Sequence, residues 1–144
     1  MAHSPFLLDG NLIAYSGDGR AARVERSRAE LGDAGVNGLF GIVDFFDDDS
    51  VHADYWERHP AGDEILYVLE GRLIASVDGE GGAEEAVIEA GQVLIVPRRR
   101  WHRLQVLEPG RLLFFTPAAG SQLRPCAKEG ASPAPVPGAS AWDC

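Results

Sequence analysis

The stretch WERHPAGDE, residues 56–64, places two glutamates and a histidine around a turn signal. Glu57 and His59 are two positions apart, so on an extended strand both side chains point to the same face. Residues 60–63, PAGD, have the composition of a tight turn. Glu64 opens the next apolar run and can face the same interior. The stretch therefore predicts two strands joined by a turn, with three polar side chains directed at one interior.

Working outward, short apolar runs rich in β-forming residues alternate with turn signals from residue 37 to residue 117. The predicted strands are Leu39 to Phe46, Val51 to Arg58, Glu64 to Glu70, Leu73 to Val77, Ala86 to Ile88, Val93 to Val96, Trp101 to Leu107, and Leu112 to Thr116. Gly71, Asp78-Gly79, Gly91 and Pro109-Gly110 are among the residues expected to end them. Short runs with turn signals at this spacing are typical of an antiparallel sandwich or barrel, so the predicted fold class is all-β.

The two flanks differ from this central region. Residues 20–31 have helix-forming composition but weak amphipathicity, and the pattern leaves a short helix or a polar edge strand open. The C-terminal stretch is rich in Pro, Ala, Ser and Gly, a composition that buries too little apolar surface to offset the entropy of ordering it. We therefore divide the chain into an irregular N-terminal extension packing on the barrel (1–36), the barrel (37–117) and a flexible C-terminal tail (118–144).

Composition narrows the class of protein. The 144 residues favour a single domain. With 22 acidic and 13 basic residues the formal net charge is −9, which disfavours nucleic acid and anionic membranes as partners. The two cysteines, Cys126 and Cys144, predict no disulfide framework. No secretory signal and no membrane span is recognisable, so the expected location is the cytoplasm.

A second histidine completes a candidate metal site. His102 follows the run GQVLIVP and begins another alternating strand, with Leu104 and Val106 on its face. The predicted ligands are Glu57, His59, Glu64 and His102. Two imidazoles and two carboxylates suit iron, manganese, nickel or zinc, and the two carboxylates balance a divalent charge. As an alternative to a ligand role, Glu57 can act as a catalytic general base beside a metal-bound water.

These residues give the chain a resemblance to the cupin superfamily. The first cupin motif has two histidines, a glutamate and a glycine, to which His59, Glu64 and Gly71 correspond at the family's spacing. The second motif has a glycine, a proline and a histidine, to which Gly91, Pro97 and His102 correspond. Among the departures, Glu57 stands where the family has its first histidine, and Arg99 stands where it has a glycine.

The resemblance implies a double-stranded β-helix, or jelly-roll barrel, with the four ligands at its mouth. It also implies a homodimer and a small-molecule ligand or substrate. Three functions remain open at this stage. The first is a metal-dependent enzyme of isomerase, lyase or dioxygenase type that acts on a small polar or anionic metabolite. The second is a non-catalytic barrel that binds or senses a small molecule or metal. The third is a structural dimer with a vestigial site.

Overall fold

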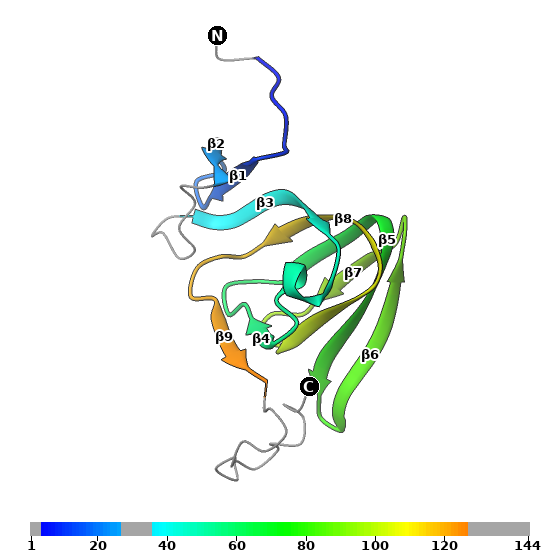
Figure 1. Ribbon diagram of the computed structural model, residues 1–144. Coiled ribbons are helices and arrows are strands. Elements are labelled where there is room, and N and C mark those ends of the chain that lie inside the picture. The colour runs from blue at the N-terminus through cyan, green and yellow to red at the C-terminus, as the bar shows by residue number, and fades with distance from the viewer. Residues whose placement is uncertain (1–3, 27–35, 127–144) are drawn as a thin grey trace.

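The computed structural model describes residues 4–26 and 36–126, which form a curled antiparallel β-sheet (Figure 1). The elements are β1 (Asn11–Ser16), β2 (Ala21–Glu25), β3 (Val36–Phe45), the 3-10 helix η2 (Asp48–Val51), β4 (Tyr55–Arg58), β5 (Glu64–Gly79), β6 (Gly82–Glu89), β7 (Val93–Val96), β8 (His102–Thr116) and β9 (Gln122–Pro125). The all-β prediction is confirmed. Within these residues there is no helix with the length and hydrophobicity that a membrane crossing requires.

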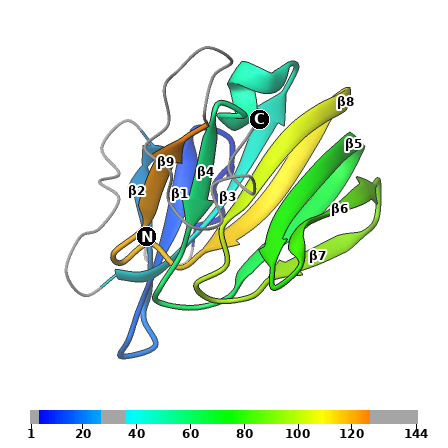
Figure 2. The same ribbon diagram turned by 90° about the horizontal axis from the view of Figure 1, so that it is seen from below.

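Strand β8 holds the sheet together. It pairs with β3 and β4 within the strand path β2-β1-β3-β8-β4-β9, and it also pairs with β5, which lies off that path. β5 pairs in turn with β6 and β7. Figure 2 shows this division, with β5, β6 and β7 on one side of β8 and β1, β2, β4 and β9 on the other. The sheet can therefore curl around side chains contributed by strands that are distant in sequence.

The strands β5 and β8 are longer than the sequence predicts. Gly71 and Pro109-Gly110 were expected to end strands, but both strands continue through them, and the pairing register shifts between Val68 and Leu73. A Cβ on Gly71 would lie 2.4 Å from the carbonyl oxygen of Pro109, and Gly71 has a φ of +82°. A glycine inside a strand commonly marks a bulge or a close backbone approach, and here two glycines allow the paired strands to bend.

The core lies inside the curl. Its main cluster is made of side chains that alternate inward along β3, β5, β6, β7 and β8: Phe45, Leu66, Val68, Leu73, Ala75, Ile88, Val96 and Leu112. A smaller cluster joins the N-terminal hairpin to β3 through Leu12, Ala14, Leu39 and Ala118. Because β1 pairs with β3 in register, with Ala14 opposite Leu39, the N-terminal strands extend the barrel wall.

Several local predictions need correction. Of the predicted strand Val51 to Arg58, only Tyr55–Arg58 is extended, because η2 is capped by Asp47 and ends at His52 with a φ of 54°. The undecided segment 20–31 contributes the strand β2, and its residues 27–31 lie outside the described part.

The C-terminal region also differs from the prediction. Part of the expected tail is strand β9, which pairs with β4 from Tyr55 opposite Pro125 to Arg58 opposite Gln122. Residues 122–125 therefore belong to the sheet, whereas residues 127–144 lie outside the described part. Cys126 is buried and disulfide-bonded, contrary to the expectation that the chain has no disulfide.

Candidate metal centre

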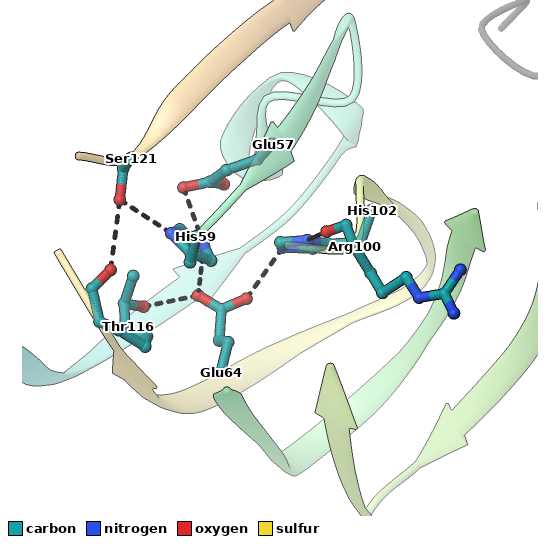
Figure 3. A network of polar contacts seen from close by, with 8 residues as sticks. Glu57, His59, Glu64, Arg100, His102, Thr116 and Ser121 are labelled. Carbon is teal, nitrogen blue, oxygen red and sulfur yellow. Dashed lines mark hydrogen bonds and ion pairs between the residues drawn. The ribbon is translucent and has the colours of Figure 1, made fainter. Parts of the chain in front are cut away.

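The four predicted ligands come together at one end of the curl (Figure 3). Glu57 lies on β4 directly opposite His102, the first residue of β8. His59 follows the end of β4, and Glu64 is the first residue of β5. The turn predicted from residues 60–63 thus brings His59 and Glu64 together, and the pairing of β4 with β8 adds Glu57 and His102.

The carboxylate of Glu64 lies between the two imidazoles. Its Oε1 is 2.9 Å from Nε2 of His102, and its Oε2 is 3.1 Å from Nε2 of His59. Oε1 of Glu57 is 3.4 Å from the same nitrogen of His59. Glu64 and the two histidines are buried, whereas the side chain of Glu57 is 37% exposed. The site therefore has an inner part and one acidic group at its open side.

Contacts on the far side of each ring fix which nitrogen faces the centre. Ser121 Oγ donates to the carbonyl of Pro117 at 3.3 Å and lies 2.8 Å from Nδ1 of His59, so it accepts the Nδ1 proton. Nδ1 of His102 lies 3.4 Å from the carbonyl oxygen of Arg100, which can only accept. In the neutral rings both Nε2 atoms then present lone pairs to the centre, as in metal-binding histidines whose other nitrogen is held by an oxygen.

Nε2 lone pairs that face carboxylate oxygens are repelled by those oxygens unless a cation lies between them. Nε2 of His59 is buried, and its polar neighbours among the described residues are the carboxylate oxygens of Glu57 and Glu64. Glu57, His59 and His102 each offer a ligand atom, and these atoms lie within 4.8 Å of one another. Both observations fit a metal ion, and the mixed nitrogen and oxygen donor set is the one that divalent transition metals accept.

Ionisation in the site follows from this arrangement. Burial opposes the charged form of Glu64, but hydrogen bonds from His102 and His59 outweigh it and lower the pKa of Glu64 to about 2. For His102, burial acts to lower the pKa, and the contact with Glu64 more than compensates, so the pKa is raised. Burial, followed by the charge of Glu64, raises the pKa of Glu57. Without a metal, the charged forms of Glu64 and His102 therefore stabilise each other.

The metal-free protein is expected to be most stable at mildly acidic pH. The stabilisation from Glu64 is complete above its unfolded pKa of 4.5 and is lost as pH falls toward 2. The stabilisation from His102 is complete below its unfolded pKa of 6.5 and is lost as pH rises through the higher folded value. Because the pKa of Glu57 is also raised, Glu57 likewise makes the folded protein less stable as pH rises. Urea midpoints of chelator-treated protein should therefore peak between about pH 4.5 and 6.5, and a continued rise to pH 8.5 would contradict the assignment.

Two polar residues at the site had no sequence signal. Thr116 Oγ1 donates to Oε2 of Glu64 at 2.6 Å, and Ser121 holds His59. Neither residue belongs to a recognisable motif, because each reaches the centre only through the pairing of distant strands. Each contacts one side chain of the cluster, as residues surrounding metal sites commonly do.

A cavity of about 320 Å³ adjoins the cluster. Glu57, Glu64 and His102 form its polar end. Its apolar walls include Leu12, Leu39, Leu66, Leu104, Leu112 and Phe114. Leu104, which the sequence places on the same strand face as His102, is among these lining residues. The volume lies at the small end of the range for ligand pockets, so the site can accept a small molecule with an apolar body.

The turn before His102 has a non-glycine residue in the left-handed backbone conformation. Arg99 has a φ of 69°, the left-handed conformation that glycine adopts most readily, and its backbone N–H donates to the carbonyl of His59 at 3.1 Å. This hydrogen bond ties the turn to the first ligand segment. The side chains of Arg98, Arg99 and Arg100 are exposed and do not line the cavity.

Comparison with known proteins places this geometry in a family. Residues 50–116 match the family described as Cupin domain. These residues are a cupin domain. The resemblance inferred from the two motifs is thereby confirmed, together with the cupin-like jelly-roll fold. The match begins in η2 and ends at the last residue of β8, so it contains all four predicted ligands.

Individual proteins are similar to this chain at low identity. The tetracenomycin polyketide synthase protein TcmJ of Streptomyces glaucescens is 32% identical over 81 residues, which are 55% of this chain and 50% of the relative. This chain thus spans about half the length of that relative. The hydroxypropylphosphonic acid epoxidase from S. wedmorenis aligns with a TM-score of 0.51 at 19% identity, over 78% of this chain and 58% of the epoxidase. A variant of oxalate decarboxylase from Bacillus subtilis aligns with a TM-score of 0.47 at 19% identity, over 60% and 23% of the two chains.

Proposed function

We propose that this cupin is a metal-dependent enzyme that binds one divalent ion through Glu57, His59, Glu64 and His102. The observation that carries the proposal is the convergence of two imidazole Nε2 atoms on two carboxylates, at distances of 2.9–3.4 Å, at the end of a cavity. A bound metal would supply Lewis-acid chemistry or a site for O₂, and the ligand set suits iron, manganese, nickel or zinc.

Each residue has a distinct task in this proposal. His59 and His102 are held by Ser121 and Arg100 so that Nε2 stays available to the ion. Glu64 balances charge from the buried side and is oriented by the hydroxyl of Thr116. Glu57 closes the open side, where its partial exposure also lets it exchange a proton with a substrate in the cavity.

The cavity directs the choice of substrate. About half of its lining side chains are apolar, and its polar lining includes residues of the proposed metal centre. We propose a small substrate with an apolar carbon skeleton and an oxygen-bearing group that reaches the metal. The name of the relative TcmJ connects that protein with a polyketide synthase. A polyketide fragment, which has carbonyl oxygens on a carbon skeleton, has the chemistry that this cavity would accept.

Two substitutions of Glu57 test its place in the centre. Glu57→Gln removes the charge, and because Glu57 is proposed as a ligand, zinc affinity should fall by roughly 10-fold or more. Glu57→His restores the family's histidine and should retain zinc binding. Affinity is measured by competition with a chromophoric chelator. If Glu57→Gln binds zinc as tightly as the wild type, Glu57 is not a ligand and only the role of base remains.

We also propose that the cupin forms a homodimer through its outer apolar face. Ile65 is in register with Ile95 on β7 and with Phe115 on β8. Phe115 is in register with Phe40, and Phe40 with Ile13. The outer apolar face consists of Ile13, Tyr15, Phe40, Ile42, Ile65, Tyr67, Val93, Ile95, Leu113 and Phe115. A continuous apolar surface of this kind favours association, and a single patch that contacts its own copy gives a closed dimer.

Ile95→Lys is expected to shift the protein from dimer to monomer, because the side chain at position 95 is 58% exposed and lies within this face. Light scattering coupled to size exclusion measures the change. Leu107→Lys is the matched control, since Leu107 is 43% exposed but lies outside the face. A wild-type protein that stays monomeric at high micromolar concentration would rule the interface out.

A further inference from the structure

Arg26 provides the cavity with a cationic group that the metal centre does not use. It follows β2 and is among the residues that line the cavity. One guanidinium nitrogen donates to the carbonyl of Ile42 at 2.7 Å, and the guanidinium carbon lies 5.9 Å from the ring centre of Phe114, another lining residue. These two contacts hold the group against the apolar wall and leave most of its five N–H donors for other partners.

Arg26 and Arg103 are the two arginines that line the cavity, and neither pairs with a carboxylate of the described residues. Some arginines elsewhere do, as Arg72 does with Glu108 at 3.1 Å and Arg111 with Asp44 at 2.7 Å. Within residues 4–26 and 36–126, Arg26 has no carboxylate partner, although the chain carries 22 acidic residues. An arginine held on a cavity wall without a counter-ion is suited to bind an anionic group of a ligand, because its planar fork matches a carboxylate.

We propose that Arg26 is a specificity-determining residue that binds a carboxylate or similar oxyanion of the substrate. The proposal rests on the proposed function, because it assigns the orientation of the substrate in the same cavity. Glu57 and Glu64 make the metal end of the cavity rich in negative charge. An anionic group not bound to the metal is therefore attracted to Arg26 and repelled from the carboxylates, while the apolar skeleton packs on Phe114 and its neighbours.

The test compares two probes that differ in charge. 2-Naphthoate and its neutral isostere 2-naphthamide are titrated calorimetrically into the protein as isolated, and again after chelator treatment. Wild-type protein should bind the naphthoate roughly tenfold more tightly in both preparations, as expected for a charge-assisted hydrogen bond. In Arg26→Gln the two affinities should become about equal, and retained naphthamide binding shows that the cavity is intact.

Arg23→Gln is the matched control. Arg23 also lies over an aromatic ring, 5.5 Å from the centre of Phe6, but it does not line the cavity, so the preference for naphthoate should remain. An unchanged preference in Arg26→Gln would overturn the proposal, as would a wild type that binds neither probe or prefers neither. A preference seen only before chelator treatment would also overturn it, since the metal would then bind the carboxylate. If the protein binds no metal, the preference for naphthoate over naphthamide should still be seen, so the two proposals fail separately.

Discussion

Gly110→Ala is expected to destabilise the protein by about 3 kcal/mol or more, or to prevent folding. A Cβ at this position would lie 1.8 Å from the carbonyl oxygen of Glu70 and 2.7 Å from the backbone nitrogen of Gly71. Both contacts are with backbone, so no side-chain rotation relieves them. The bend of β8 against β5 would have to open, and that bend joins the two parts of the sheet that enclose the core.

Urea denaturation of the variant and of Gly81→Ala provides the comparison. Gly81 lies in the turn before β6, and a Cβ there meets no atom within 4 Å, so its substitution should change the free energy of unfolding by no more than about 0.5 kcal/mol. If Gly110→Ala proves as stable as this control, the close crossing of β5 and β8 is wrong.

His59→Ala and His102→Ala are each expected to lower the affinity for a divalent metal by more than about 100-fold. Loss of a residue that merely orients a ligand costs 10–100-fold in typical metal sites, and loss of the ligand itself should cost more. Both substitutions remove an Nε2 atom that lies within 3.1 Å of the Glu64 carboxylate. Titration of chelator-treated protein with zinc and with manganese measures the effect.

His52→Asn is the control for the loss of a cavity histidine. His52 lines the same cavity but lies outside the cluster of ligand atoms, and asparagine tolerates its φ of 54°. Its metal affinity should match the wild type. Equal affinities for His59→Ala, His102→Ala and the wild type would place the metal elsewhere or nowhere in this domain.

That the four side chains converge could be predicted from the sequence, because the signal was local on both sides of the cluster. Glu57, His59 and Glu64 lie around one short turn, so period two and the turn composition suffice to bring them together. His102 needed the second motif, whose glycine, proline and histidine spacing places it at the start of a strand. The strand ends at Asp78-Gly79 and Pro97 were likewise readable, because those residues close β5 and β7.

What the sequence did not predict depends on contacts between distant strands. Gly71 and Gly110 were interpreted as strand ends, yet each continues a strand because the other glycine makes room for a close approach. Strand β9 and the contact of Ser121 with His59 exist only because β4 offers an edge to a segment whose composition is typical of a loop. Arg26 reaches the cavity from the end of a hairpin whose secondary structure the pattern left open.

The central claim is that one divalent ion binds to two histidines of this domain. The most direct test is to measure the metal content of protein purified without chelator and to record X-ray absorption at the edge of the metal found. The account predicts about one ion per chain, with two imidazoles and carboxylate oxygens in its coordination shell. Protein that is empty as isolated and refuses added metal, or a bound ion without histidine ligands, would contradict it.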